Sequence, residues 1–226
     1  MSSAMQPAER HAFQHDDGTL GYLLYRPAAT VGQETPRPLI LFLHGRGESG
    51  DDLELVKLFG LPAVLERGDE LPALVIAPQC PADSDWEAQT ANLAALLDDV
   101  CARKQVDTTR VYLTGLSMGG RGSWLLALAQ PARFAAVACM ASRIPFAIRP
   151  TPDFTPLRTM PIWVFHGALD PIAPLNDAEA LVAALRAAGA DPRVTIYPDA
   201  DHDSWTAAYN DPALYTWLFA QRKGLA

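Results

Sequence analysis

Short apolar runs alternate with longer amphipathic stretches along most of this chain. The runs are rich in β-branched and aromatic residues, which favour strands. We expect strands at residues 20–25, 38–43, 73–77, 110–114, 135–140, 162–165 and 194–197. Between them, residues 87–104 and 177–188 repeat leucine and valine with the period of a helix. A mostly parallel sheet with helices on both faces produces this pattern, so the sequence predicts an α/β fold.

The length and composition fit one domain. The chain has 226 residues, 49% of them hydrophobic, which is enough for one large core. Neither an internal repeat nor a Pro/Gly/Ser-rich linker divides it, so we expect residues 1–226 to form one domain. The long irregular stretch 142–161 contains five prolines. We expect a surface loop there, because the stretch is too short for a large cap domain.

Charge and cysteine content narrow the classes of partner. The 18 basic and 26 acidic residues give a net charge of −8, and no basic run is present, which disfavours nucleic acid and anionic membranes as partners. Residues 1–18 carry no apolar run, so we expect no secretory signal. No stretch approaches the ~18 apolar residues of a membrane span. Cys80, Cys101 and Cys139 are too scattered for a disulfide framework, which predicts a cytoplasmic protein with reduced cysteines packed as small apolar residues. The oligomeric state is not indicated.

The sequence Gly115-Leu-Ser-Met-Gly119 follows a predicted strand and leads into the apolar helical stretch 124–129. A serine hydroxyl is a weak nucleophile, so it must be presented to a base and to N–H donors that stabilise an oxyanion. A tight strand-to-helix turn does both, and glycines relieve its crowding. A glycine-rich turn with an incidental serine is the alternative interpretation. Because the motif lies between strand and helix, we identify Ser117 as the nucleophile and the amide of Met118 as an oxyanion donor.

An acid and a histidine follow Ser117 in the expected order. Asp170 comes just after the strand at 162–165, and His202 comes just after the strand at 194–197. Open α/β sheets build their sites at the carboxyl ends of parallel strands, so these side chains should meet Ser117. Asp170 would then orient His202 and stabilise its imidazolium form when His202 takes the serine proton. A second oxyanion donor is expected from the loop after residues 38–43.

Several blocks of the chain resemble a known superfamily. The blocks are Leu43-His-Gly-Arg-Gly-Glu48, Pro78-Gln-Cys-Pro81, Gly115-Leu-Ser-Met-Gly-Gly120, His166-Gly-Ala-Leu-Asp170 and His202-Asp-Ser-Trp205. From Leu39 onward the chain resembles the α/β-hydrolases, and within them the small esterases of the phospholipase/carboxylesterase (acyl-protein thioesterase) and dienelactone-hydrolase-like groups. The resemblance implies an α/β-hydrolase fold without a large cap, ester or thioester hydrolysis, and the amide of Arg46 as the second oxyanion donor. Dienelactone hydrolases proper use a cysteine nucleophile, where this chain has Ser117.

Two other motifs point to bound ligands. Gly45-Arg-Gly-Glu-Ser-Gly50 fits a dinucleotide-binding pattern, but Asp51 and Asp52 would repel a pyrophosphate there. The segment 199–203 begins like a calcium loop, but it lacks the glycine and the final glutamate that such a loop needs. We therefore expect no cofactor and no metal. The acids of this segment would cap and solvate the turn that carries His202, and His44 would hold its loop through a hydrogen bond.

Arginines and tryptophans cluster where the fold places the mouth of the site. Arg46, Arg121, Arg143 and Arg149 could form an anion-binding rim, and Trp86 and Trp205 could form an apolar wall. The alternative is that the arginines pair with acids such as Glu48, Asp51 and Asp153, and that the tryptophans pack beneath their loops.

The residues favour a carboxylesterase-type serine hydrolase acting on a small-molecule ester or thioester. A peptidase or amidase would use the same three side chains, and a cofactor-free perhydrolase is another alternative. A non-catalytic binding protein of the same fold is a further alternative, since fold alone does not fix function. The complete set of Ser117, Asp170 and His202 favours an enzyme over a binding protein.

Overall fold

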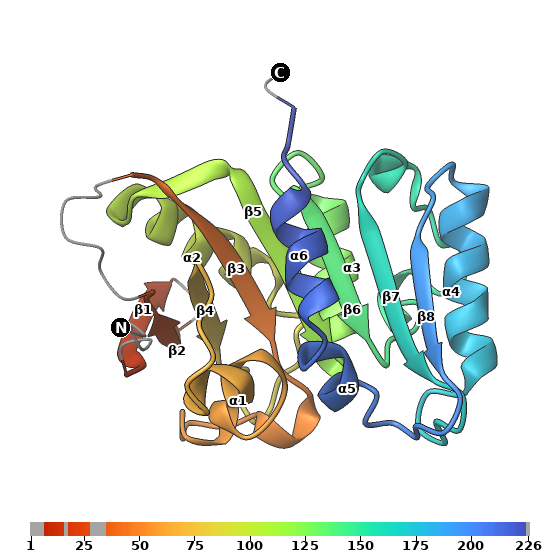
Figure 1. The fold of residues 1–226 in the computed structure, drawn as a ribbon, viewed down its shortest axis with the longest axis horizontal. Coiled ribbons are helices and arrows are strands. Elements are labelled where there is room, and N and C mark those ends of the chain that lie inside the picture. Colours follow the sequence, from red (N-terminus) through yellow and green to blue (C-terminus); the bar gives the residue numbers. More distant parts are fainter. Residues whose placement is uncertain (1–6, 16–17, 28–34, 225–226) are drawn as a thin grey trace.

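An eight-stranded sheet forms the centre of the computed structural model, which describes residues 7–15, 18–27 and 35–224. The strands are β1 (Glu9–His15), β2 (Gly18–Tyr25), β3 (Arg37–Leu43), β4 (Leu74–Pro78), β5 (Val106–Leu116), β6 (Ala136–Met140), β7 (Ile162–Gly167) and β8 (Arg193–Tyr197). Their order is β1-β2-β4-β3-β5-β6-β7-β8 (Figure 1). The six strands β4, β3, β5, β6, β7 and β8 pair in parallel, in that order across the sheet. Strand β2 pairs antiparallel with both β1 and β4. The predicted, mainly parallel sheet is confirmed.

Helices cover both faces of the sheet. They are α1 (Gly60–Glu66), α2 (Thr90–Arg103), α3 (Met118–Ala129), α4 (Leu175–Ala187), α5 (Trp205–Tyr209) and α6 (Pro212–Ala220). Helices α1, α5 and α6 lie in front of the sheet in Figure 1 and share one apolar cluster with it. Helices α2, α3 and α4 pack in the other cluster, on the opposite face. The described residues thus form one small α/β domain, with the sheet between two layers of helices.

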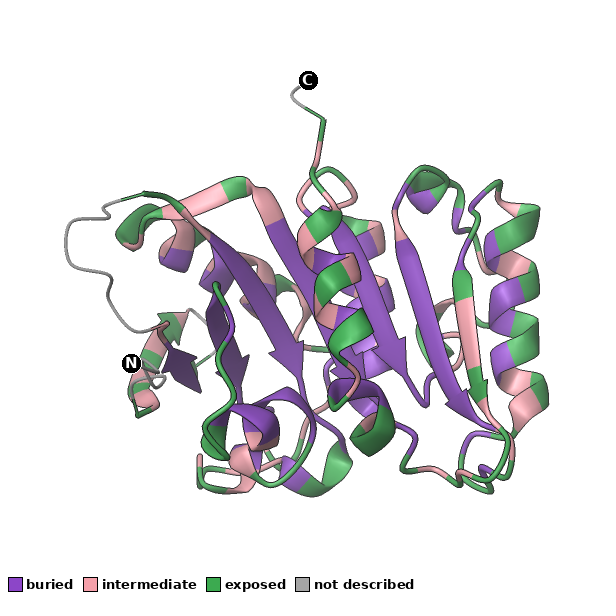
Figure 2. Ribbon diagram, in the orientation of Figure 1, coloured by how far each residue is buried: buried purple, intermediate pink, exposed green. Residues whose placement is uncertain are grey.

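The central strands are buried on both faces, as Figure 2 shows. In β3, Leu39, Leu41 and Leu43 belong to one apolar cluster, and Ile40 and Phe42 belong to the other. This alternation follows from the two-residue period of a strand. It explains why the central strands are continuous apolar runs in the sequence.

All seven predicted strands and both predicted amphipathic helices are present, but strand β1 was not predicted. Its residues alternate between half-buried and exposed, and it forms an antiparallel hairpin with β2 at the edge of the sheet. A strand with one face in solvent needs no apolar run, so β1 lacks the signal that marks the central strands. Residues 1–6, 16 and 17, part of the segment for which no signal peptide is expected, lie outside the described residues.

The stretch 142–161 is anchored more deeply than a surface loop. It contains two short 3-10 turns, η3 (Phe146–Ile148) and η4 (Thr155–Leu157). Phe154 and Leu157 are fully buried and join the apolar cluster on the α3 side of the sheet. Their burial holds the stretch against the domain, so it does not form a separate cap. Within the part of the chain that the structure describes, none of the helices has the length and apolar character needed to cross a bilayer.

Helix α3 approaches the end of β3 so closely that only glycine fits at position 119. A Cβ atom on Gly119 would lie 2.0 Å from the carbonyl oxygen of Leu43. The two backbones would have to separate to admit it, and overpacking of this kind costs roughly 1–3 kcal/mol or more. We expect Gly119→Ala to lower the free energy of unfolding by at least about that amount in a urea titration.

The matched control is Gly47→Ala, because a Cβ atom at Gly47 would meet no atom within 4 Å. This variant should unfold at the wild-type urea concentration. Equal stability of the two variants would contradict a close approach of α3 to β3.

Candidate active site

Ser117 occupies a strained turn between β5 and α3. Its φ of 52° and ψ of −113° lie outside the regions that residues with a side chain normally adopt. The amide of Ser117 donates a hydrogen bond to the carbonyl of Met140 (2.9 Å), and the carbonyl of Ser117 accepts one from the amide of Arg121 (3.2 Å). These bonds fix the residue between β6 and the first turn of α3. The structure therefore has the strand-turn-helix geometry that the sequence predicts around Ser117.

The structure brings Ser117, His202 and Asp170 together in one hydrogen-bonded chain. His202 Nε2 lies 2.9 Å from Ser117 Oγ, and His202 Nδ1 lies 2.7 Å from Asp170 Oδ2. A carboxylate oxygen can only accept, so Nδ1 carries the proton that bonds Asp170. Nε2 is then free to accept the proton of the serine hydroxyl. The arrangement is that of a nucleophile, a general base and a group that orients the base.

The carboxylate of Asp170 is held by its own loop as well as by its bond to His202. It is 4% exposed, and its Oδ1 accepts hydrogen bonds from the amides of Ile172 and Ala173, both at 2.8 Å. His166, which is fully buried, has its Nε2 2.7 Å from the carbonyl oxygen of Ala173 and 3.6 Å from Asp170 Oδ2. The loop after β7 thus holds the carboxylate in one orientation, with Oδ2 directed at His202.

The ring of His202 also contacts an aromatic side chain. Trp205 packs edge-to-face against it, with the ring centroids 5.1 Å apart. The sequence offered Trp205 as part of a substrate wall or as a residue packed beneath its loop, and the structure shows it in contact with the His202 ring. The acids around His202 cap its turn as expected: Asp201 Oδ1 accepts from the amide of Asp203 (3.0 Å), and Asp203 Oδ1 accepts from the amide of Thr206 (2.9 Å). The described residues contain no group of three or more His, Cys, Asp or Glu arranged to hold a metal.

Two amides lie where an oxyanion hole is expected. Met118 is the first residue of α3, and Arg46 is the first residue of the 3-10 turn η1 (Arg46–Glu48). Amides at the start of a helical turn have no acceptor within that turn, so they remain available to bind an anion. The loop before Arg46 borders the nucleophile, since a Cβ atom on Gly45 would lie 3.8 Å from Ser117 Cβ. The assignment of both amides to an oxyanion stays a prediction.

His44 has the structural role that the sequence indicates. It is 1% exposed, its Nε2 accepts a hydrogen bond from the amide of Cys80 (2.9 Å), and its carbonyl accepts one from Trp86 Nε1 (2.9 Å). Glu48, considered above as a partner for the arginines, is buried instead, with Oε2 3.6 Å from His44 Nδ1. Together these bonds join the loop after β3 to the loop after β4.

The prediction that Trp86 forms part of a substrate wall is wrong. The side chain is fully buried, its Nε1 is bonded to His44, and its ring packs edge-to-face on the His44 ring. It also lies directly against α3, where a Cβ atom on Gly122 would be 2.2 Å from Trp86 Cβ. Trp86 therefore supports the loop from beneath and has no surface to offer a substrate.

The arginines near the site are occupied by protein partners. Three of them pair with acids: Arg121 Nε with Glu87 Oε1 (2.8 Å), Arg143 Nη1 with Asp177 Oδ2 (3.1 Å) and Arg149 Nη2 with Asp177 Oδ1 (3.3 Å). Arg46 Nη1 donates to the carbonyl of Ser84 (2.7 Å). The structure thus favours the pairing alternative over an anion-binding rim, although the paired acids are not those the sequence suggested.

The contacts of Glu87 were not predicted from the sequence. Its carboxylate accepts from Arg121 Nε and from the amides of Phe146 (3.4 Å) and Ala147 (3.1 Å). The partners lie 34 to 60 residues away along the chain. No local pattern marks such a contact, because it depends on the tertiary fold.

The cysteines are not placed to act as nucleophiles. Cys80 and Cys139 are fully buried, and burial raises the pKa of the Cys80 thiol to about 12 and also raises the pKa of Cys139. Burial likewise raises the pKa of Cys101. A thiol must ionise to attack, so these environments suppress reactivity.

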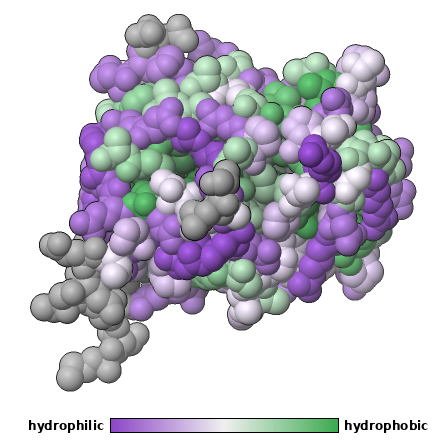
Figure 3. Space-filling model, turned by 90° about the horizontal axis from the view of Figure 1, so that it is seen from above, coloured by the Kyte–Doolittle hydropathy of each residue, from purple (hydrophilic) through white to green (hydrophobic). Residues whose placement is uncertain are grey.

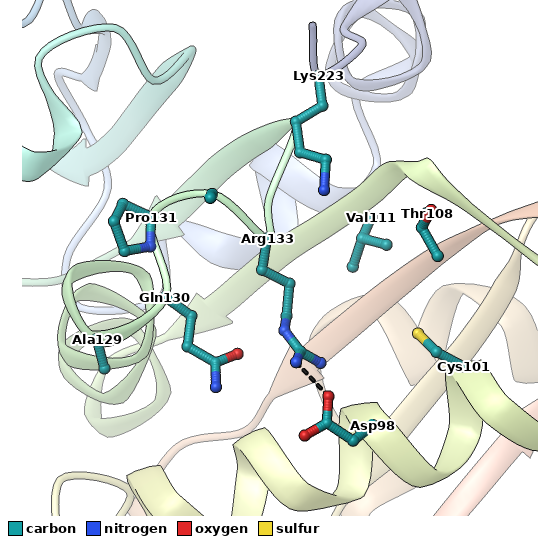
Figure 4. A pocket seen from close by; sticks show the side chains of 10 residues that line it. Asp98, Cys101, Thr108, Val111, Ala129, Gln130, Pro131, Arg133 and Lys223 are labelled. Carbon is teal, nitrogen blue, oxygen red and sulfur yellow. Dashed lines mark hydrogen bonds and ion pairs between the residues drawn. The ribbon is translucent and has the colours of Figure 1, made fainter. Parts of the chain in front are cut away.

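A cavity of about 530 Å³ lies away from Ser117, near the start of β5. Its lining includes Thr108 and Val111 from β5, Arg133 paired with Asp98, and Lys223 from the carboxyl-terminal segment (Figure 4). Figure 3, seen from above Figure 1, shows hydrophilic and hydrophobic residues intermixed over that end of the molecule. None of the three candidate catalytic side chains lines this cavity.

Comparisons with known proteins identify the family. The model of the dienelactone hydrolase family matches residues 80–213, more than half of the chain. A protein of Nocardia uniformis named for esterase activity, NocK, is 28% identical over 187 residues, covering 77% of this chain and 52% of that protein. A protein of Escherichia coli (strain K12) named as a carboxymethylenebutenolidase is 33% identical over 119 residues, covering 50% of this chain and 44% of that protein. The chain thus spans about half the length of these relatives.

A solved structure agrees with the sequence matches. The crystal structure of a thermostable esterase superposes with a TM-score of 0.79 at 27% identity, covering 95% of this chain and 63% of that one. The likeness extends over almost the whole sheet with its helices.

The geometry at Ser117 predicts selective covalent labelling. A fluorophosphonate should add one adduct per chain, on Ser117, because this hydroxyl lies 2.9 Å from His202 Nε2. His202→Ala should slow labelling at least ~10³-fold, since the base is lost. The adduct is located by peptide mass spectrometry.

The matched control is His11→Ala, which removes a histidine from the edge strand β1 and should label at the wild-type rate. Labelling of another residue, or wild-type labelling of His202→Ala, would contradict the assignment of the nucleophile and its base.

Proposed function

The chain belongs to the dienelactone hydrolase family, and we propose that it is a serine hydrolase that cleaves carboxylic esters through an acyl-serine intermediate. The observation that carries the proposal is the hydrogen-bonded chain from Ser117 through His202 to Asp170. We further propose that residues 1–226 act as one domain in the cytoplasm, with a small-molecule ester or thioester as substrate.

In the first half of the reaction, His202 Nε2 takes the proton of Ser117 as Oγ attacks the ester carbonyl. Asp170 stabilises the resulting imidazolium through its bond to Nδ1. The carbonyl oxygen becomes negative as the tetrahedral intermediate forms, and the amides of Met118 and Arg46 are the proposed donors to it. His202 then returns the proton to the departing alcohol, which leaves an acyl group on Ser117.

In the second half, His202 acts as a base toward water. Water loses a proton to Nε2 and attacks the acyl carbon, and the same amides hold the oxyanion. Collapse of this intermediate breaks the bond to Ser117 Oγ, which recovers its proton from His202. The products are a carboxylic acid and an alcohol, and the enzyme returns to its starting state.

The proposed nucleophile of this chain is a serine, Ser117, and this affects which substrate the family membership supports. Dienelactone hydrolases proper use a thiol, so we do not assign dienelactone to this chain on family membership alone. A thioester is attacked by the same hydroxyl and is included in the proposal. A peptidase would use the same groups, and no residue in the site favours an amide over an ester.

The proposal predicts a pattern of rates. Wild-type protein should hydrolyse p-nitrophenyl esters with saturation kinetics and a kcat/KM well above that for the matching anilide, because an amine is the poorer leaving group. Ser117→Ala should lower kcat by roughly 10⁴-fold, and Asp170→Asn should lower it somewhat less. The rates are measured by nitrophenolate and nitroaniline release, with circular dichroism to confirm folding.

A folded Ser117→Ala variant that kept near-full esterase activity would refute the proposal. A kcat/KM for the anilide above that for the ester would show that the protein is an amidase and not an esterase.

A further inference from the structure

Large apolar side chains are exposed at the edge of the sheet that carries Ser117. Among the described residues, the exposed ones are Leu58, Phe59, Phe146, Leu169, Ile172 and Ile196. All but Ile196 lie on chain segments that follow the carboxyl ends of β3, β6 and β7. Leu169 and Ile172 flank the candidate catalytic Asp170. Exposed apolar groups gathered at one site mark a binding surface more often than scattered ones do.

Phe146 differs from the others because its ring is held although it is 51% exposed. The guanidinium carbon of Arg121 lies 4.6 Å from the ring centroid, and that of Arg143 lies 5.7 Å from it. A cation over an aromatic face is attracted to it, and the attraction is stronger when the cation is partly desolvated. The side chain of Arg121 is only 13% exposed.

Glu87 fixes both Arg121 and the backbone that carries Phe146. Its carboxylate, 11% exposed, accepts from Arg121 Nε and from the amides of Phe146 and Ala147. One largely buried carboxylate therefore orients the Arg121 guanidinium and anchors the turn η3. The ring of Phe146 is held in place by these contacts before any ligand arrives, which lowers the entropy lost on binding.

The segment that carries Phe146 runs beside the nucleophile. Ser117 donates its amide proton to the carbonyl of Met140, and two residues later the chain packs so tightly on α3 that a Cβ atom on Gly120 would lie 2.6 Å from Ser142 Cβ. Arg121 links the nucleophile to Phe146 directly, because its amide donates to the Ser117 carbonyl and its guanidinium faces the ring of Phe146.

Arg143 joins Phe146 to the loop that carries the acid. Its Nη2 donates to the carbonyl of Ile172 (2.6 Å), and its Nη1 pairs with Asp177. Ile172, 58% exposed, thus belongs to the same connected surface as Phe146. The arginines of this region are used within the protein to hold apolar side chains at the site.

We propose that Phe146, with Ile172 and Leu169, binds the acyl chain of an uncharged ester, and that Arg121 and Glu87 are positioning residues for Phe146. The inference rests on the proposed esterase function and specifies its substrate class: esters of apolar or aromatic acids, not of dicarboxylic acids. The acyl carbon is bonded to Ser117 in the intermediate, and Arg121 connects the Ser117 backbone to the ring of Phe146, so the proposal directs the acyl chain from Ser117 toward that ring.

The test is the ratio of kcat/KM for p-nitrophenyl hexanoate to that for p-nitrophenyl acetate. The wild-type protein should prefer the hexanoate, and Phe146→Ala should lower the ratio about tenfold through a higher KM for the hexanoate. Phe146→Leu keeps an apolar side chain and should give an intermediate ratio. Ile196→Ala, on β8, is the matched control for loss of an exposed apolar group and should keep the wild-type ratio.

Glu87→Gln tests the positioning role. Loss of the carboxylate charge should loosen Arg121 and lower the hexanoate-to-acetate ratio in the same direction as Phe146→Ala, with the change in KM and not in kcat. In the double variant with Phe146→Ala, Glu87→Gln should have no further effect on the ratio, because it acts through the ring. A merely structural role would lower kcat for both esters equally.

The outcomes separate the two proposals. An unchanged ratio in a folded, active Phe146→Ala variant would overturn the acyl-binding assignment and leave the esterase function standing. Preference of the wild-type protein for a hemisuccinate ester over the neutral butyrate at low salt would also overturn it, since it would require a free cation at the site. Absence of Ser117-dependent hydrolysis for every ester would overturn the function and the inference together.

Discussion

The close approach of α3 to the end of β3 is the constraint on which the site depends. Gly119 lies against the carbonyl of Leu43, so the chain must turn within a few residues after β5. Ser117 takes up that turn with a positive φ, and bonds to Met140 and Arg121 hold it there. The loop before Arg46 also borders this turn, since a Cβ atom on Gly45 would lie 3.8 Å from Ser117 Cβ, and Met118 begins helix α3 directly after Ser117. Backbone strain at a functional residue persists only where the surroundings determine it in this way.

The candidate catalytic side chains could be predicted because topology places them together. Parallel strands end at one edge, so Ser117, Asp170 and His202, each just beyond a strand, had to meet there. The central strands were equally visible as apolar runs. Strand β1 escaped prediction because only one of its faces is covered. The partners of Trp86 and of the arginines were not predicted, because contacts between residues far apart in the sequence leave no local pattern in it.

The electrostatics of the site follow from these pairings. A protein of net charge −8 could draw anions only through a local cluster of free cations. Glu87 and Asp177 pair with Arg121, Arg143 and Arg149. The guanidinium groups of these arginines stabilise the loop after β6 and the ring of Phe146. The exposed side chains on either side of Asp170 in the chain are apolar. This local surface supports our proposal of a neutral ester, whereas the sequence left open both an anion-binding rim and arginines paired with acids.

We propose that Ser117 carries the acyl group between the two halves of the reaction. Rapid acid quenching of the protein during turnover of a p-nitrophenyl ester, followed by peptide mass spectrometry, tests it directly. We expect one acyl group on the peptide containing Ser117, forming with the burst of nitrophenolate and disappearing as substrate is exhausted. Turnover with no acylated peptide at any quench time, or with the acyl group on another residue, would rule out this role for Ser117.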